Sequence, residues 1–460
     1  MFQKTLRGVW LGLMMMLFLT SGIVICAEQD SAPTSNAAKG EMLMATSQGV
    51  SIIEEDGWSV LDESNGLPNN RVNAIAVDKE GRIWVAHGSG LSVLDQDQWT
   101  HYLRSEMFKI LGFSINDINV LACDAQGKVW TGHSQGLYVI ENEEWKTYEG
   151  SVFGVDKYVG VEDIAIDAEE RVWVAHNYGV SVFDGNDWTL HNVETSDLPS
   201  RFTEAIAIDQ EGKVWVAHNY GVSVFDGNDW TSYGSGTKAD VEVKALLQAK
   251  DIAVDKQNRI WVVTFAKGVS VFDGSKWETY TRANSGLIGG RGKTIACDAQ
   301  GRVWVGTDWE LAVFEGNQWL IYTQATSGLV DNGINAVTRI GDGPSSLPLP
   351  REAQSGSISG QLISQEVAVE GAEINICWDV SWPVFFGPTP CKGEVYKGVT
   401  DSEGNFSIGN IPIGAYKLAI RIMEEEKAKW YTGGGIGNLP ATLHIISGEE
   451  THLDKLSIGK

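Results

Sequence analysis

Apolar and polar residues alternate along short stretches of this chain, and turn residues separate the stretches. In RVWVAHNYGVSVFDGNDWT (171–189), valines such as Val172 and Val174 occupy every second position, as in half-buried strands. Asn-Tyr-Gly and Asp-Gly-Asn-Asp lie between the valine pairs and are typical of tight turns, because glycine adopts positive φ without steric cost. The same stretch recurs at 213–231 with only its first residue changed. The pattern predicts short strands joined by hairpins and repeated at a fixed period.

Tryptophan marks this repeat at two positions, with a period of 41 to 47 residues that is typical of a four-stranded propeller blade. The two series are Trp84, Trp130, Trp173, Trp215, Trp261, Trp304 and Trp58, Trp99, Trp145, Trp188, Trp230, Trp277, Trp319. Six units are complete. A seventh is split, because the segment around Ile334–Ile340 supplies one strand and residues 41–64 supply the rest. We therefore predict an all-β chain whose residues 41–341 form a seven-bladed β-propeller, closed by strands from both ends of the array.

The segments outside the repeat have other compositions. Lys4 and Arg7 precede an apolar run, so residues 1–27 are expected to be a secretory signal peptide, with lipid anchoring at Cys26 as a less favoured alternative. Residues 28–40 are expected to be a polar spacer, and 342–356, rich in Pro and Ser, a linker. Residues 357–460 have a strand pattern of their own and a turn at Asp401–Asn405, which predicts a small β-sandwich.

Charge and cysteine content narrow the function classes. The formal net charge of −25 excludes nucleic acid and anionic membrane surfaces as expected partners, since both are bound by clustered cations. Beyond the signal segment, the sequence has no other run that is apolar enough to span a membrane. Cys123 and Cys297 occupy one repeat position and should be buried, whereas Cys377 and Cys391 are expected to form a disulfide after export.

The repeat, for example IAVDKEGRIWVAHGSGLSVLDQDQW at 75–99, resembles the propeller repeat of two-component regulator sensors. This resemblance covers about residues 41–341 and implies a periplasmic or extracellular propeller that binds a ligand or partner, here with no kinase of its own. The tail is similar to carboxypeptidase regulatory-like domains, which are transthyretin-like sandwiches. Gly360, Val369, Gly371, Ala372 and TDSEGNFSIGNIPIGAYKL at 400–418 carry that similarity, which implies a fold and no peptidase activity.

One face of the predicted propeller gathers residues that can bind a ligand. The loop between the second and third strands of a blade lies on the same face as the connection to the next blade, where the central channel opens. These loops begin with a histidine in four consecutive repeats and with threonine in others: His87, His133, His176, His218, Thr264 and Thr307. The imidazoles either line the mouth and contact a ligand, or are copied with the repeat and bonded locally inside each blade. No metal ion or other cofactor is expected.

Aromatic residues belong to the same loops and can stack on a sugar or peptide. They are Tyr178, Tyr220, Phe265 and Trp309. A second recurrent set ends each first strand and is expected to cap turns: Asp78, Asp124, Asp167, Asp209, Asp255 and Asp298. The sequence contains no catalytic motif. We therefore expect a secreted, periplasmic or cell-surface propeller that binds a small molecule, glycan or protein at its mouth. A lyase or hydrolase with a mouth histidine as base, or a structural cell-surface protein, is the alternative.

Overall fold

The computed structural model describes residues 40–460, except 56, 107–116, 143, 155–157, 236–240, 286, 288–290, 325, 349, 351–355, 365–366, 379–394, 412–413, 425–426, 433–442, 446–449 and 459–460. The predicted signal peptide, Cys26, nearly all of the spacer and Cys391 of the predicted disulfide lie outside the described residues. Within the described residues, no helix is both long enough and apolar enough to cross a membrane.

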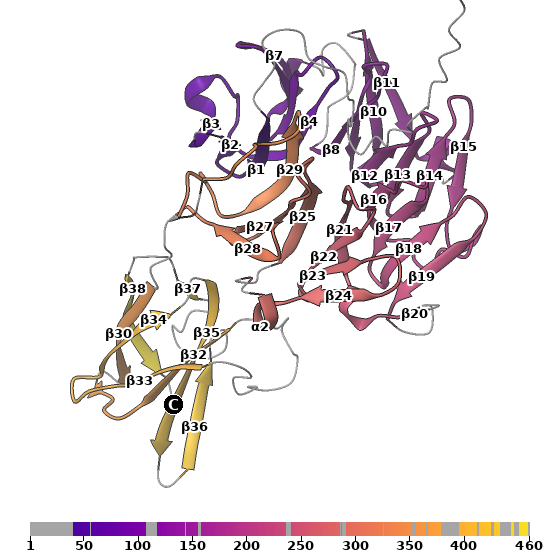
Figure 1. Cartoon of the computed structure of the whole chain (residues 1–460). Coiled ribbons are helices and arrows are strands. Elements are labelled where there is room, and N and C mark those ends of the chain that lie inside the picture. Colours follow the sequence, from indigo (N-terminus) through magenta and orange to yellow (C-terminus); the bar gives the residue numbers. More distant parts are fainter. Residues whose placement is uncertain are drawn as a thin grey trace, which may run out of the picture.

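Seven antiparallel sheets form a closed ring, which confirms the predicted seven-bladed propeller (Figure 1). Each sheet is a blade, and its first strand lies innermost. Successive inner strands contact one another all the way round, from β29 to β4 and on through β8, β12, β16, β21 and β25 back to β29. Blade 1 is β29 (Ile334–Ile340), β1 (Glu41–Thr46), β2 (Gly49–Glu54) and β3 (Gly57–Leu61). Blade 2 is β4 (Val72–Val77), β5 (Ile83–His87), β6 (Gly90–Asp95) and β7 (Gln98–Leu103).

The other five blades follow the same order. Blade 3 is β8 (Ile118–Cys123), β9 (Val129–His133), β10 (Gly136–Glu141) and β11 (Glu144–Glu149); blade 4 is β12 (Val161–Ile166), β13 (Val172–His176), β14 (Gly179–Phe183) and β15 (Trp188–His191). Blade 5 is β16 (Thr203–Ile208), β17 (Val214–His218), β18 (Gly221–Phe225) and β19 (Trp230–Gly234), with the short parallel β20 (Val241–Glu242) added outside. Blade 6 is β21 (Ala249–Val254), β22 (Ile260–Thr264), β23 (Val269–Phe272) and β24 (Trp277–Tyr280); blade 7 is β25 (Gly292–Cys297), β26 (Val303–Thr307), β27 (Leu311–Glu315) and β28 (Gln318–Tyr322). The described helices are η1 (Glu63–Asn65), η2 (Gly150–Phe153), η3 (Lys244–Leu246) and α2 (Arg282–Ser285).

The two ends of the array close the ring. β1 pairs antiparallel with β29, with Leu43 opposite Thr338 and Met42 opposite Arg339. This is the predicted closure, and it covers the edge that an open array would leave unpaired. Trp58 of blade 1 lies 5.7 Å from Tyr322 of blade 7, between ring centroids, so aromatic packing continues across the closure.

Each junction between blades holds its own apolar cluster, so the buried apolar residues are distributed around the whole ring. The tryptophan that begins the fourth strand packs against the aromatic ring on the fourth strand of the preceding blade. Trp145 meets Tyr102 at 5.5 Å and 66°, and Trp319 meets Tyr280 at 5.8 Å and 69°. These edge-to-face contacts add specific geometry to the buried area, which is why the second tryptophan series recurs.

The recurrent aspartates cap turns, as predicted, and also hold the first tryptophan series in place. Gly81 donates its backbone N–H to the Asp78 carbonyl at 2.9 Å, which closes the turn after β4. The Asp78 carboxylate accepts the backbone N–H of Arg82 at 3.0 Å and the Trp84 indole N–H at 2.7 Å. The indole bond recurs in all six complete blades. The split blade has Ile340 in place of the aspartate and Leu43 in place of the tryptophan, so it lacks both residues of this hydrogen bond.

The start of the predicted linker packs on the propeller. The Ala299 backbone N–H donates to the Asp342 carbonyl at 3.2 Å, and the Arg302 guanidinium donates to the Pro344 carbonyl. Leu347 packs against the apolar cluster between blades 7 and 1. Residues 341–347 therefore form a strap across the end of the ring that lies opposite the start of β29.

Shortening the chain should show what the strap contributes. We expect a chain that ends at Pro348 to unfold at the same urea concentration as a longer chain that includes the C-terminal strands. A chain that ends at Ile340 should lose about 1–3 kcal/mol, because Leu347 no longer covers its cluster and Arg302 loses a buried acceptor. Equal midpoints for the two shortened chains would show that the strap adds nothing to stability.

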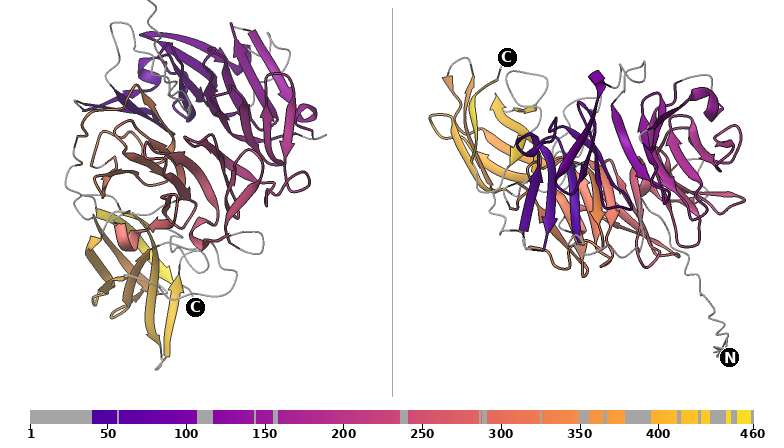
Figure 2. Two further views of the ribbon diagram at one scale, coloured as in Figure 1. Left: turned by 45° about the vertical axis from the view of Figure 1, so that its right-hand side comes forward. Right: turned by 90° about the horizontal axis from the view of Figure 1, so that it is seen from above.

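Beyond the strap, strands β30–β38 pair into two further sheets, drawn in orange to yellow apart from the blades (Figure 2). They are β30 (Gly356–Ser364), β31 (Val367–Ala368), β32 (Glu373–Trp378), β33 (Val395–Val399), β34 (Asn405–Ile411), β35 (Gly414–Glu424), β36 (Lys427–Thr432), β37 (Leu443–Ile445) and β38 (Glu450–Ile458). The turn predicted at Asp401–Asn405 forms, with the Gly404 N–H bonded to the Asp401 carbonyl at 2.9 Å. The resemblance of this region to a carboxypeptidase regulatory-like domain stays a prediction.

Candidate functional site

A β-bulge interrupts the inner strand of every blade at its second residue. In blade 2, Val72 pairs with His87 and Ala74 with Ala86, so Asn73 has no partner in the ladder. The same skip occurs in the other six inner strands. A bulge re-aims the extra residue out of the regular alternation, and here the seven extra residues all line the central channel. We call them the mouth ring: Asn73, Asn119, Glu162, Glu204, Lys250, Lys293 and Asn335.

The mouth ring lies at the end of the channel that carries the loops between second and third strands. The residue before each bulge pairs with the last residue of the second strand, as Gly292 does with Thr307. Those loops and the connections between blades therefore surround the same opening, as the sequence predicted. The channel beneath the ring encloses a cavity of about 310 Å³.

The mouth-ring side chains link neighbouring blades. The Asn335 amide donates to the Val72 carbonyl at 2.9 Å, which ties the last strand to blade 2. The Asn73 amide donates to the Ile118 carbonyl at 3.3 Å. On the other side of the ring, Lys250 forms an ion pair with Glu204, with a distance of 2.7 Å between Nζ and Oε2. Amides thus occupy the arc of blades 1 to 3, and charged groups occupy the arc of blades 4 to 7.

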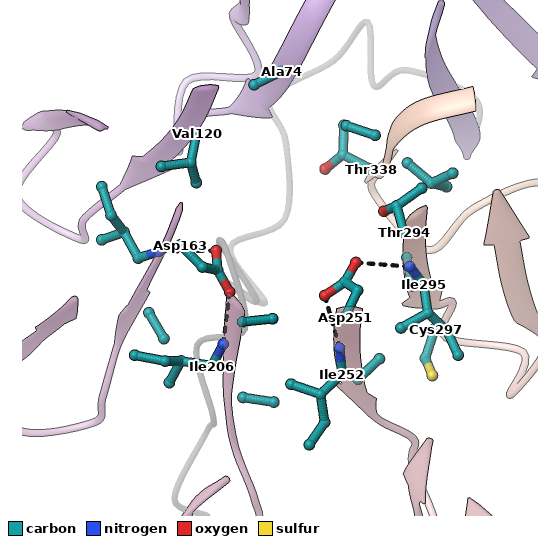
Figure 3. A pocket seen from close by; sticks show the side chains of 18 of the residues that line it. Ala74, Val120, Asp163, Ile206, Asp251, Ile252, Thr294, Ile295, Cys297 and Thr338 are labelled. Carbon is teal, nitrogen blue, oxygen red and sulfur yellow. Dashed lines mark hydrogen bonds between the residues drawn. The ribbon is translucent and has the colours of Figure 1, made fainter. Parts of the chain in front are cut away.

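Two carboxylates lie just below the mouth ring and point into the same cavity (Figure 3). Asp163 follows the bulge of β12, and Asp251 follows the bulge of β21. Burial, reinforced by the charge of Asp251, raises the pKa of Asp163 to about 8. Burial raises the pKa of Asp251 to about 6. The channel can therefore bind protons near neutral pH.

The four histidines lie inside the blades and do not line the mouth. His87, His133, His176 and His218 are each at most 3% exposed. In each, Nδ1 accepts the backbone N–H two residues later, at 3.1–3.2 Å. Of the two arrangements expected from the sequence, local bonding inside each blade is the one that describes these rings. They stay buried because one nitrogen caps the loop while the rest of the ring fills the blade.

The other ring nitrogen also has a local role in most blades. His87, His176 and His218 place Nε2 2.7–2.9 Å from a serine hydroxyl on the third strand. His133 instead stacks on Tyr138, with 4.1 Å between ring centroids. Burial lowers the pKa of His87 and His133 to about 4, and of His176 and His218 to about 3. The imidazoles are therefore neutral at physiological pH and are weak bases.

The threonines at the same repeat position accept a backbone N–H of the following loop, as the histidines do. The Thr307 hydroxyl accepts the backbone N–H of Trp309 at 3.0 Å, and the Thr264 hydroxyl accepts that of Lys267 at 2.9 Å. Both threonines are buried. Either residue type serves at this position because each offers an acceptor to the turn that follows.

The aromatic side chains of this face differ in exposure. Tyr220 is exposed, whereas Tyr178, Phe265 and Trp309 are half-buried. Phe265 lies under the Arg291 guanidinium, 5.1 Å from its ring centroid. Two further aromatic residues, Tyr158 and Phe202, lie in the connections between blades and are 69% and 45% exposed.

Exposed apolar side chains concentrate on the face that carries the mouth. Seven large apolar residues of the described chain are exposed, and six of them lie on the connections and loops at this face, from blade 3 to blade 6. They are Val152, Tyr158, Val193, Phe202, Tyr220 and Val241, and the seventh is Val399. We call these six residues the rim. An apolar surface beside a polar channel mouth is typical of a binding site.

The sequence interpretation overlooked the mouth ring. Its signal was present, since a polar residue stands second in the first strand of every blade, as in VNAIAV and INVLAC. No group of three or more His, Cys, Asp or Glu is placed to hold a metal ion in the part of the chain that the structure describes.

The comparisons with known proteins agree with the architecture. Residues 66–89, which include β4 and β5, match the family model described as "Two component regulator propeller". The search of curated proteins returned no match for this sequence. Several solved structures are similar in fold, and the similarity supports no statement about ligand or activity.

Three of these solved structures come from proteins of different kinds. The extracellular domain of a putative hybrid two-component system from B. thetaiotaomicron is 14% identical, with 84% of this chain and 56% of that chain covered and a TM-score of 0.49. PorZ, a surface component of the type-IX secretion system of Porphyromonas gingivalis, is 16% identical, with 84% and 55% covered and a TM-score of 0.45. Virginiamycin B lyase from Staphylococcus aureus is 12% identical, with 81% and 99% covered and a TM-score of 0.45. The chain thus spans little more than half the length of the first two structures.

Proposed function

We propose that this protein acts outside the cytoplasm and binds an oligosaccharide at the mouth of its propeller. The observation that carries the proposal is that the rim and the mouth ring lie on the same face of the propeller. Aromatic rings stack on the apolar faces of sugars, while amide, ammonium and carboxylate groups bond to sugar hydroxyls. The propeller match at residues 66–89 is consistent with a binding propeller.

The charge of the opening favours a neutral ligand. In the mouth ring, Lys250 is paired with Glu204, and Lys293 lies 2.8 Å from Asp308. The Arg201 guanidinium lies over Phe202, 4.6 Å from its ring centroid, so it covers one face of that ring. Both mouth-ring lysines are thus paired with carboxylates, whereas Glu162 has no ion pair among the described residues, so the opening favours a neutral ligand over an anionic one.

The strap begins at the end of the channel away from the mouth. β29 runs from the mouth ring at Asn335 to Ile340, and the strap continues from there at the opposite end of the channel. We propose that the C-terminal region serves attachment or docking while the mouth binds its ligand.

Removing a rim aromatic should weaken binding without unfolding the blades. We expect Phe202→Ala and Tyr220→Ala each to reduce affinity about tenfold, because each removes a stacking surface worth ~1.4 kcal/mol. The measurement is a glycan array followed by calorimetric titration with the oligosaccharide that binds best. Val399→Ala is the matched control, since it removes an exposed apolar side chain elsewhere.

Histidine variants separate this proposal from the imidazole interpretation. His176→Thr and His218→Thr reproduce the residue that other blades use at this position, so they should leave affinity unchanged. If these variants lost binding while the rim variants bound as tightly as the wild type, the binding site would lie at the histidines. An array with no glycan bound would reject the oligosaccharide proposal and favour a peptide or a structural role.

A further inference from the structure

Two blades depart from the repeat directly below the mouth ring. Asp163 and Asp251 occupy a position that the other five blades fill with uncharged residues: Ala74, Val120, Ala205, Thr294 and Ala336. Figure 3 shows both carboxylates directed into the cavity from β12 and β21, on either side of an open space. The repeat does not require a charge at this position, so these two side chains call for a role of their own.

Each carboxylate bridges two adjacent blades. Asp163 accepts the backbone N–H of Ile164 at 2.8 Å in its own strand and that of Ile206 at 2.7 Å in β16. Asp251 accepts the backbone N–H of Ile252 at 2.7 Å in its own strand and that of Ile295 at 2.8 Å in β25. The pair therefore joins the inner strands of blades 4 and 5, and those of blades 6 and 7.

The nearest cations are engaged with other partners. Lys250 pairs with Glu204, and Lys293 pairs with Asp308 and donates to the Asn335 amide oxygen at 3.2 Å. The remaining titratable or charged residues that line the cavity are Glu162 at the mouth ring and Asp255, Lys256, Cys297, Asp298 and Arg339 nearer its other end. Burial, the charge of Asp251 and the charge of Glu162 all disfavour the ionised Asp163, which is why its pKa is raised.

We infer that Asp163 and Asp251 form a proton-responsive pair whose charge loosens the inner strands of blades 4 to 7. When both are ionised, two like charges face one cavity with no cation bonded to either among the described residues. When they hold protons, the repulsion is gone, and the carboxyl oxygens still accept the bridging N–H groups, as weaker acceptors than a carboxylate. The pair lies one residue below the mouth ring, so its charge also sets the width of the opening, a consequence that rests on the proposed function.

Hydrogen exchange tests the pair without any ligand. We would measure backbone amide protection at pH 6 and pH 9, corrected for the intrinsic pH dependence of exchange. In the wild type, the protection of the Ile206 and Ile295 amides should fall at least tenfold between pH 6 and pH 9. In the Asp163→Asn, Asp251→Asn double variant, the protection of these amides should be the same at both pH values. The amides of Ile75 and Val337, on the opposite arc, serve as internal references.

The outcomes are distinct. Asp197→Asn, an exposed change of the same charge, should retain the wild-type pH response. Equal protection at pH 6 and pH 9 in the wild type, or an unchanged pH response in the double variant, would overturn the inference. Should the double variant fail to fold, infrared spectroscopy of each single variant decides: the wild type at pH 7 should show a protonated carboxyl band that Asp163→Asn removes, and its absence from the wild type would also overturn the inference. None of these results depends on whether a glycan binds.

Discussion

Acidification should unfold the propeller between about pH 6 and pH 4, because four buried histidines must remain neutral in the folded state. In the unfolded chain their pKa is about 6.5, whereas burial lowers it to about 4 in His87 and His133 and to about 3 in His176 and His218. A depressed pKa contributes stability above the unfolded value and loses it as pH falls. At ~1.4 kcal/mol per pH unit and histidine, the loss by pH 4.5 is on the order of 10 kcal/mol, comparable to the whole stability of a domain.

The measurement is urea unfolding from pH 8 down to pH 4. We expect the midpoint of the His176→Thr, His218→Thr variant to fall less steeply with acid than that of the wild type, because two of the four protonation sites are gone. The two proteins should be closest in stability above pH 7, where the histidines are neutral in both states. Parallel pH profiles would contradict the assignment of acid sensitivity to these rings.

Asp163 acts in the opposite direction. Its folded pKa of about 8 lies above the unfolded value of 3.8, so it contributes stability at low pH and loses it as pH rises through 8. Together with the histidines, this carboxyl places the maximum stability of the propeller near pH 7, where the histidines of the unfolded chain have released most of their protons.

Asp298→Ala should destabilise the propeller more than any other exchange of a turn-capping aspartate, by about 3–5 kcal/mol. The Asp298 carboxylate accepts the Trp304 indole N–H at 2.9 Å and the Arg302 Nε–H at 2.5 Å. The Arg302 side chain is only 2% exposed, because the strap lies over it. Removing the carboxylate therefore takes the nearest counter-charge from a buried guanidinium and leaves Glu315, 3.7 Å from Nη1, as the remaining one. Urea unfolding at pH 7 measures the effect.

Asp124→Ala is the matched control. Asp124 also caps its turn and accepts the Trp130 indole N–H at 3.1 Å, but the following basic residue is Lys128, which pairs with Glu141 on the surface. We expect this variant to lose about 2 kcal/mol, the cost of one buried indole N–H and the turn bonds. Equal losses in the two variants would mean that the buried Arg302 charge adds nothing.

Much of the fold could be predicted from the sequence because each blade repeats the same local chemistry. The strand alternation, the turn glycines and the paired Asp and Trp positions all recur with one period. The split unit could be assigned because residues 41–64 lack a first strand and Ile334–Ile340 lack the rest. The turn-capping role of the aspartates followed from residue type and spacing.

The candidate site was predicted less well, and the reason lies in how side chains are directed. The face on which the loops lie follows from antiparallel topology. The burial of the histidines does not, because a histidine at the end of a strand suits either solvent or a local acceptor. Nothing in the residue pattern indicates that Nδ1 turns back to its own loop.

The sequence by itself therefore determined the repeat, the blade count and the closure, because these depend on local strand and turn propensities and on counting. Only the tertiary structure decided which polar groups reach the channel. A bulge brings two consecutive residues of a strand, such as Asn73 and Ala74, to the channel, so its position sets which side chains line the centre. The strap and the Asp163–Asp251 pair likewise arise only when distant blades meet around one axis.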